Sequence, residues 1–169
     1  MTDMRKRCCF TGHRPDKVGK NENFIKEQLR KCIKDAIQEG YLTFISGMAM
    51  GVDMWAAEIV IEEKENNPEI KLVCASPYPD FEKNRSLADR IKYQFVIENS
   101  DYIINVSDKY TRFCFQIRNM WMVDRADRVI AVYNGSRGGT HNTVEYAKKK
   151  NIQIVNVLNQ NSACGTYKE

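Results

Sequence analysis

Residues 42–53, with the sequence LTFISGMAMGVD, contain the pattern that decides the fold of this chain. Residues 42–46 are almost continuously apolar, which is typical of a β-strand that is covered on both faces. A loop with two glycines follows, and residues 52–66 then carry apolar side chains at helical spacing. The stretch therefore predicts a strand, a glycine-rich turn and a helix, which together make the repeating unit of an α/β domain.

The same unit recurs along the chain. Further strands are predicted at residues 7–11, 71–75, 102–106, 128–133 and 153–158, and further helices at residues 23–39, 86–99, 115–125 and 140–150. Ser86 is the predicted N-cap of its helix. This alternation predicts a Rossmann-like three-layer domain over residues 1–158, with a mostly parallel sheet of about six strands and helices on both faces. Residues 159–169 are predicted to be a polar C-terminal tail.

Composition excludes several classes of protein. The 169 residues are 43% hydrophobic and 28% charged, as in an ordinary globular domain, and the formal net charge is only +4. Because there is no apolar run of about 18 residues and no signal peptide, we expect a cytoplasmic protein without a membrane partner. The six cysteines form no Cys-x-x-Cys pair, and there are only two histidines. The sequence thus predicts reduced, buried thiols, no metal site and no cofactor.

The positions of the glycines are the main functional signal. Six of the nine, at positions 12, 47, 51, 135, 138 and 139, directly follow predicted strands. Ligands of parallel α/β sheets bind at this edge, where glycine lets the backbone approach a phosphate and helix N-termini offer free N–H groups. The loops 46–51 and 135–140 match neither the dinucleotide fingerprint nor the Walker A motif. The alternative is that these glycines only make tight turns.

Polar residues beside these glycines complete the predicted ligand site. Arg14 and Arg137 could bind phosphate, and Asp53 or Glu145 could accept from ribose hydroxyls. The alternatives are solvated arginines and a carboxylate that only complements a helix dipole. His13 could bind ligand, cap a turn or act as a general base, whereas Met48 and Tyr78 could pack on a base or in the core. The predicted ligand-binding residues are Thr11, Gly12, His13, Arg14, Ser46, Gly47, Met48, Ala49, Gly51, Asp53, Tyr78, Gly135, Arg137, Gly138, Gly139 and Thr140.

Three of these segments resemble a known family. Residues 9–15 (CFTGHRP), 46–53 (SGMAMGVD) and 138–140 (GGT) are similar to the YpsA-like branch of the SLOG superfamily, which also contains the DNA-processing protein DprA and the LOG phosphoribohydrolases. The resemblance extends over about residues 7–157. It implies a Rossmann-like protein that binds a nucleotide or a nucleotide-derived, ADP-ribose-like ligand as a sensor, and that forms homo-oligomers.

The LOG branch implies an alternative function, cleavage of the N-glycosidic bond of a nucleoside 5′-monophosphate. Its motif has an arginine nine residues before an aspartate, and Arg118 stands nine residues before Asp127. Arg118 and Glu145 are therefore the candidate catalytic residues if the protein is an enzyme. The match is partial, because Glu145 stands five rather than three residues after Thr140, a shift of roughly 200° around a helix.

The DprA relationship implies a second alternative, binding of single-stranded DNA. Such binding calls for a basic groove with stacking aromatic side chains. The charges of this chain are spread along the sequence, and the densest basic run, residues 148–150, is explained by a helix C-terminus. The sequence therefore argues against a nucleic-acid partner and favours a nucleotide-derived small molecule.

Overall fold

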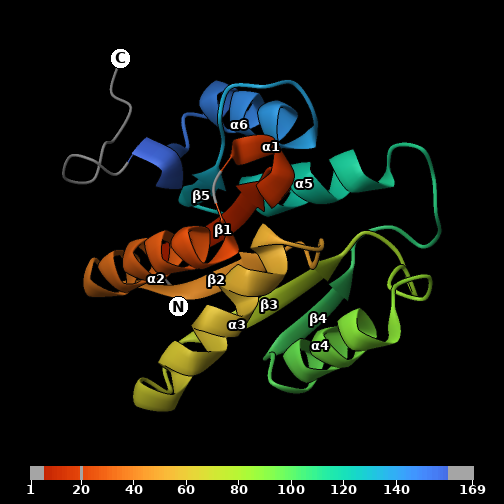
Figure 1. The fold of residues 1–169 in the computed structure, drawn as a ribbon, viewed down its shortest axis with the longest axis horizontal. Coiled ribbons are helices and arrows are strands. Elements are labelled where there is room, and N and C mark those ends of the chain that lie inside the picture. Colours follow the sequence, from red (N-terminus) through yellow and green to blue (C-terminus); the bar gives the residue numbers. More distant parts are fainter. Residues whose placement is uncertain (1–5, 20, 160–169) are drawn as a thin grey trace, which may run out of the picture.

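The computed structural model describes residues 6–19 and 21–159, which form a sheet with helices on both faces (Figure 1). The strands are β1 (Lys6–Gly12), β2 (Tyr41–Ser46), β3 (Lys71–Ser76), β4 (Tyr102–Asn105), β5 (Arg128–Val132) and β6 (Gln153–Asn156). The helices are α1 (Pro15–Val18), α2 (Glu22–Gln38), α3 (Val52–Asn66), α4 (Leu87–Glu98), α5 (Cys114–Asp124) and α6 (Gly139–Lys149), followed by a 3₁₀ turn at Val157–Asn159. Residues 160–169 of the predicted tail lie outside the described residues.

The sheet has the order β4-β3-β2-β1-β5-β6, and every pair of neighbouring strands is parallel. The chain therefore builds outward from β1 to β4 and then returns to add β5 and β6 on the other side of β1. This reversal lies between β1 and β5, at the place where ligands of such sheets bind. The predicted Rossmann-like, three-layer fold is confirmed, and the sheet of the described residues is wholly parallel.

Two apolar cores cover the two faces of the sheet. Phe10, Phe44 and Leu72 pack with α2, α3 and α4, whereas Cys9, Ile45 and Val129 pack with α5 and α6. Because side chains alternate along a strand, a run such as Cys8-Cys9-Phe10 supplies both cores, which explains why the strands are apolar without interruption. The cysteines at positions 8, 9, 32, 74 and 114 are buried thiols outside any disulfide, as predicted, and Cys164 lies outside the described residues.

Element bounds agree with the sequence prediction to within two residues. The side chain of Ser86 caps α4 by accepting a hydrogen bond from the Asp89 N–H, which confirms its predicted role. The short helix α1 was not predicted. It begins at Pro15, and Arg14 before it has extended backbone, as expected of a residue that precedes proline. None of the described helices is long and apolar enough to cross a membrane.

Candidate functional site

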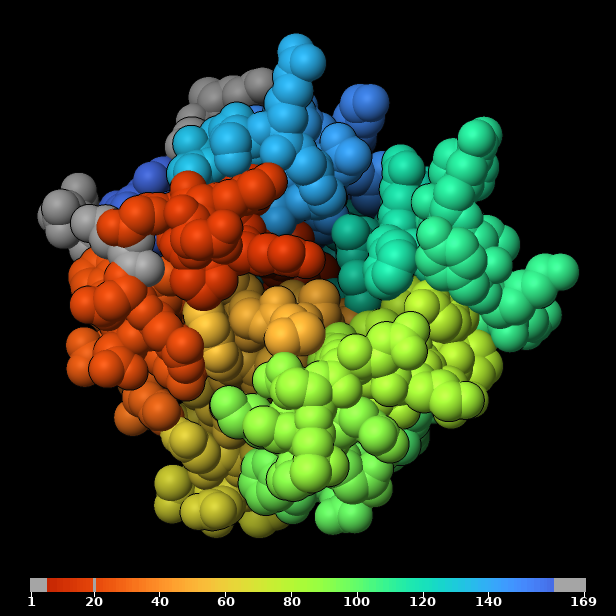
Figure 2. Space-filling view, turned by 45° about the vertical axis from the view of Figure 1, so that its right-hand side comes forward, coloured from red at the N-terminus to blue at the C-terminus, as the bar shows by residue number. Residues whose placement is uncertain are grey.

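A pocket of about 470 Å³ opens at the carboxyl ends of the central strands. We call it the strand-end pocket. Figure 2 shows the recess among the red N-terminal segment, the orange loop after β2, and the teal and blue segments. It is lined by Phe10, Thr11, Gly12, His13, Arg14, Asp16, Lys17, Ala49, Met50, Val52, Asp53, Phe115, Arg118, Asn119, Gly138, Gly139 and Thr140. Segments that follow β1, β2 and β5 thus meet here, as the sequence predicted.

The wall after β1 depends on a close approach between Gly12 and α3. A Cβ atom on Gly12 would lie 2.5 Å from Cγ2 of Val52, so no larger residue fits without a shift. The His13 N–H donates to the Val132 carbonyl at 2.9 Å, which carries the β1–β5 pairing one residue beyond the strand. Gly12 therefore lets the N-terminus of α3 reach the pocket, and His13 is held beside it.

The loop after β2 is held by a buried carboxylate and a buried guanidinium. Asp53 is 7% exposed and accepts from the Ala49 N–H at 3.3 Å, and Arg118 is 4% exposed and donates to the Gly47 carbonyl. A Cβ on Gly47 would lie 2.7 Å from the Asp53 carboxylate and 2.8 Å from the Arg118 guanidinium, so these two groups leave no room for a side chain at this position. Burial raises the pKa of Asp53, and the charge of Arg118 opposes that rise.

Further contacts fix the same loop from its other side. The Ser46 hydroxyl donates to the Asp53 carbonyl at 2.9 Å and accepts from the Met48 N–H at 3.2 Å. Met48 is wholly buried with φ of 61°, and its carbonyl accepts from Arg85 at 2.7 Å. The structure therefore places Ser46, Gly47 and Met48 behind the pocket wall rather than in its lining.

The loop after β5 is open by comparison. Residues 134–139 are all exposed, and Gly138, with φ of 143°, is the N-cap of α6. No side chain caps this helix, so the first N–H groups of α6 are left for another partner. Lys17 approaches from α1: a Cβ on Gly138 would lie 3.8 Å from its ammonium nitrogen. The α6 N-terminus and Lys17 together make a positive rim on the pocket.

His13 lies between this rim and the sheet. Its Nε2 is 3.3 Å from the Ser136 hydroxyl, and its ring centroid is 5.4 Å from that of Tyr133, whose hydroxyl is 2.5 Å from Nδ1 of His141. Burial lowers the pKa of His13, and the positive charge of Lys17 and His141 lowers it further. His13 is therefore neutral at neutral pH and can exchange hydrogen bonds with a ligand or with Ser136.

Five further predicted residues lie away from the strand-end pocket. Glu145 lines a neighbouring groove of about 390 Å³ between α5 and α6 and pairs with Lys148 at 3.0 Å, so Arg118 and Glu145 do not line the same cavity. Tyr78 packs edge-on against the aromatic rings of Phe81, Tyr110 and Phe115. Gly135 and Arg137 lie on the exposed part of their loop, and Gly51 contributes to a small cavity on the other side of the β2 loop.

The arginine–aspartate spacing that suggested a LOG-type site does not build one here. Asp127 lies at the amino end of β5, where its Oδ2 accepts from the Arg7 N–H at 3.0 Å, whereas Arg118 reaches the carboxyl edge of the sheet. The two side chains thus lie at opposite ends of the strands. Asp127 anchors the start of β1, and Arg118 supports the loop after β2.

Sequence reasoning missed Asp16, Lys17, Phe115 and Asn119, which also line the pocket. Lys17 stands only three residues after Arg14, and Asn119 directly follows Arg118. Their nearness to predicted residues was a usable signal, but the direction of each side chain depends on α1 and α5. Among the described residues, no group of three or more His, Cys, Asp or Glu side chains is placed to hold a metal ion.

Comparison with known structures supports the class of fold described above, a parallel Rossmann-like domain. The fold is similar to that of DNA processing protein A from Helicobacter pylori, with a TM-score of 0.63 at 18% identity over 90% of this chain and 65% of that one. DprA from Streptococcus pneumoniae has a TM-score of 0.62 at 15% identity over 88% of this chain and 49% of that one. This chain thus spans about two thirds of the Helicobacter protein and about half of the Streptococcus protein. The Helicobacter protein binds single-stranded DNA.

The chain belongs to the YpsA family, a SLOG family, whose model matches residues 8–160. A UPF0398 protein of Bacillus cereus is 32% identical over 154 residues, which are 83% of this chain and 81% of that protein. A UPF0398 protein of Bacillus thuringiensis is 28% identical over 154 residues, which are 86% of this chain and 84% of that protein. The family resemblance expected from the CFTGHRP, SGMAMGVD and GGT segments is confirmed.

Proposed function

We propose that the protein binds a nucleotide or a nucleotide-derived ligand such as ADP-ribose in the strand-end pocket and acts as a sensor of that ligand. The observation that carries this proposal is the uncapped N-terminus of α6 facing a pocket that Arg14 and Lys17 also line. Free helix N–H groups and two cations supply the donors and the positive charge that phosphate oxygens need. In this proposal residues 1–158 act as one ligand-binding domain.

The space beside the phosphate position supports a ligand with a base and a sugar. The α5–α6 groove and the strand-end pocket share Phe115, Asn119 and Gly139, so the two hollows adjoin at the start of α6. Phe115 is 44% exposed and offers a ring on which a base can stack. Asn119 and Asp53 offer polar atoms to ribose hydroxyls. A ligand with phosphate at Gly138–Gly139 could therefore place its base along the groove.

Thermal unfolding with added AMP, ADP, ATP, NAD and ADP-ribose tests this proposal. A ligand that binds the folded state must raise the midpoint of unfolding, by an amount that grows with its concentration. We expect at least one of these compounds to do so, and the shift to disappear when Arg14 and Lys17 are both replaced by alanine. If none of the compounds stabilises the protein at millimolar concentration, the proposal is wrong.

One observation favours a second function, the binding of single-stranded nucleic acid. Exposed aromatic and basic side chains alternate just before and at the start of α5, at Lys109, Tyr110, Arg112, Phe113 and Phe115. Stacking aromatics beside cations are typical of single-strand sites. Titration of a labelled oligonucleotide at two salt concentrations distinguishes the functions, because DNA binding weakens steeply with salt. No binding at low salt would exclude it.

We propose further that the protein is a homo-oligomer, as the resemblance to the SLOG superfamily implies. The ligand proposal is tested separately, by the thermal shift described above. Sedimentation velocity measures the oligomeric state directly.

A further inference from the structure

Exposed apolar side chains gather at one edge of the molecule. Leu87, Ile91 and Phe95 of α4 are 72%, 62% and 49% exposed, and Tyr102 and Ile103 of β4 are 60% and 54% exposed. We call these five residues the edge patch. α4 leads directly into β4, and both lie at the same border of the fold (Figure 1). A group of exposed apolar side chains at one border of a fold is typical of an interaction site.

The three helical members of the edge patch form a regular stripe. Their spacing of four residues places Leu87, Ile91 and Phe95 on one face of α4, while Tyr93 and Val96 on the other face are buried in the core. The helix is thus apolar on both sides, although only one side packs within the chain. A surface helix with one apolar face would be enough to complete this fold.

The two edge strands of the sheet, β4 and β6, differ in how far their residues are buried. In β6, Ile154, Val155 and Asn156 are buried, whereas in β4 no residue is buried and no residue is charged. An uncovered edge strand presents unpaired N–H and C=O groups, and natural proteins usually protect such an edge with charges, proline or a bulge. β4 has neither charge nor proline, so its edge is open to an extended partner strand.

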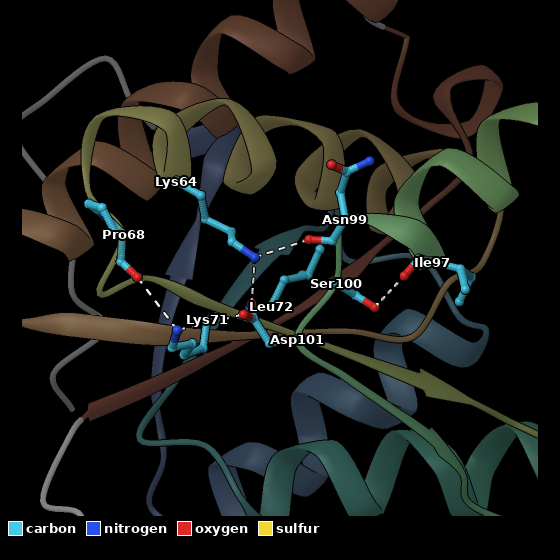
Figure 3. Close-up of polar contacts among 8 residues, drawn as sticks. All are labelled: Lys64, Pro68, Lys71, Leu72, Ile97, Asn99, Ser100 and Asp101. Carbon is cyan, nitrogen blue, oxygen red and sulfur yellow. Dashed lines mark hydrogen bonds and ion pairs between the residues drawn. The ribbon is translucent and has the colours of Figure 1, made fainter.

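The turn between α4 and β4 is fixed, so the edge patch is held in one shape (Figure 3). Lys64 donates to the Asn99 carbonyl at 3.0 Å and pairs with the Asp101 carboxylate at 2.6 Å. That carboxylate also accepts from the Leu72 N–H at 2.8 Å, which ties the start of β4 to β3. A surface that is already rigid loses little conformational entropy when it binds.

We propose that the edge patch is the interface through which a second copy of this chain binds, with the two α4 helices antiparallel and the two β4 strands neighbours across a two-fold axis. Charge on α4 favours this occupant. Arg90 and Glu98 are both exposed and stand four residues before and after Gln94. An axis beside Gln94 brings Arg90 of each copy opposite Glu98 of the other, so the surface is complementary to itself.

The antiparallel arrangement also suits β4. Two-fold symmetry pairs a strand with its own copy in the antiparallel direction, which uses the open edge of both chains at once. Ile103 would then lie beside its copy on the α4 side of the sheet, and Tyr102 on the opposite side. This inference rests on the proposed self-association and is independent of the proposed ligand.

Sedimentation velocity over about 1 to 100 µM protein tests the interface through an apolar variant and a matched control. We expect a dimer whose Kd rises at least about tenfold in Ile91→Asp, because each copy loses apolar burial and places a charge in the interface. Ile117→Asp, at a 45% exposed position of α5 outside the edge patch, should leave the Kd unchanged. Equal thermal midpoints of the two variants at a concentration where both are monomeric would show that the weaker dimer of Ile91→Asp does not come from unfolding.

A charge exchange tests the antiparallel arrangement. Arg90→Glu and Glu98→Arg should each weaken the dimer several-fold, because each places like charges opposite one another, and the double variant should restore it. If the double variant is as weak as the single ones, the arrangement is wrong.

The outcomes separate the proposals. A wild-type protein that stays monomeric overturns both self-association and this interface, and leaves the edge patch to an unlike partner. A dimer that Ile91→Asp does not weaken overturns the interface alone. The nucleotide-induced thermal shift is measured on the same variants, and its presence or absence reports only on the ligand proposal.

Discussion

The two glycine loops at the carboxyl edge of the sheet have similar compositions and opposite structures. The loop after β2 is held by Ser46, Asp53 and Arg118, and its first residues, Ser46, Gly47 and Met48, are buried. The loop after β5 is exposed from residue 134 to residue 139, and a Cβ on Gly135 or Gly139 would meet nothing within 4 Å. One loop is therefore a rigid support, and the other is an open rim.

This difference shows what glycine does in each place. Gly47 is required because the buried Asp53 carboxylate and Arg118 guanidinium leave no room for a side chain, whereas Gly138 is required by its φ of 143° at the start of α6. A support loop is expected to affect stability when it is changed, and a rim loop is expected to affect binding. The following predictions test this division, from the largest expected effect to the smallest.

Replacing Arg118 by methionine should cost the most stability. The change leaves the Asp53 carboxylate buried without its opposite charge, which typically destabilises a protein by about 3–5 kcal/mol. Urea unfolding at neutral pH measures the loss. Arg137→Met, on the exposed loop, should change the free energy of unfolding by less than about 0.5 kcal/mol. Equal losses in the two variants would contradict the division between the loops.

The loss in Arg118→Met should also depend on pH. Burial raises the folded-state pKa of Asp53 above its unfolded value, and removal of Arg118 raises it further. The folded state then binds more protons than the unfolded state, so stability falls as pH rises from the unfolded pKa through the folded pKa. The deficit relative to wild type should therefore shrink as the pH is lowered through the unfolded value of 3.8, because the carboxyl is protonated in both states below it.

The same substitution in both loops should have different costs. Gly47→Ala should destabilise by about 1–3 kcal/mol, because the new methyl group would displace Asp53 or Arg118. Gly139→Ala has open space and should be neutral within about 0.5 kcal/mol. Urea unfolding measures the free energy of unfolding of both variants, which is compared when the two transitions have the same dependence on urea concentration. A large loss in Gly139→Ala would show that the rim loop is also structural.

Lys17 and Arg137 should contribute unequally to nucleotide affinity. Lys17 lines the strand-end pocket beside Gly138, whereas Arg137 lies on the exposed loop outside the lining. Loss of a charge-assisted hydrogen bond worth about 1.4 kcal/mol raises Kd about tenfold, and we expect this of Lys17→Ala. Arg137→Ala should raise Kd less than about twofold. Titration calorimetry with the compound that gives the largest thermal shift decides between them.

His13 should give the smallest effect, a pH dependence of stability. Its pKa is lowered by burial and by the positive charge of Lys17 and His141, so the folded state binds fewer protons than the unfolded state. Its contribution to stability is present above the unfolded value of 6.5 and is lost as pH falls through the lowered pKa. Thermal unfolding across this range should show the advantage of wild type over His13→Gln decreasing as the pH falls. An advantage that grows instead would contradict the buried, neutral state of His13.

The sequence by itself determined the strands and the helices α2 to α6, because the signals are local. Apolar runs marked every strand, Ser86 marked the start of α4, and glycines marked the turns that reach the carboxyl edge. It also determined which edge carries the candidate site, since parallel strands bring all their carboxyl ends together. The family motifs lie in these same local segments.

Only the tertiary structure decided which side chains meet at that edge. Arg118 supports Gly47 from 71 residues away, and Lys17 reaches Gly138 because α1 folds back over the end of β5. Glu145 turns toward Lys148, and Asp127 serves the far end of the sheet. These outcomes depend on how helices and loops pack across the sheet, which the spacing of residues along the chain does not encode. The physical reason is that direction and burial are properties of the assembled core, whereas strand and helix patterns belong to each segment alone.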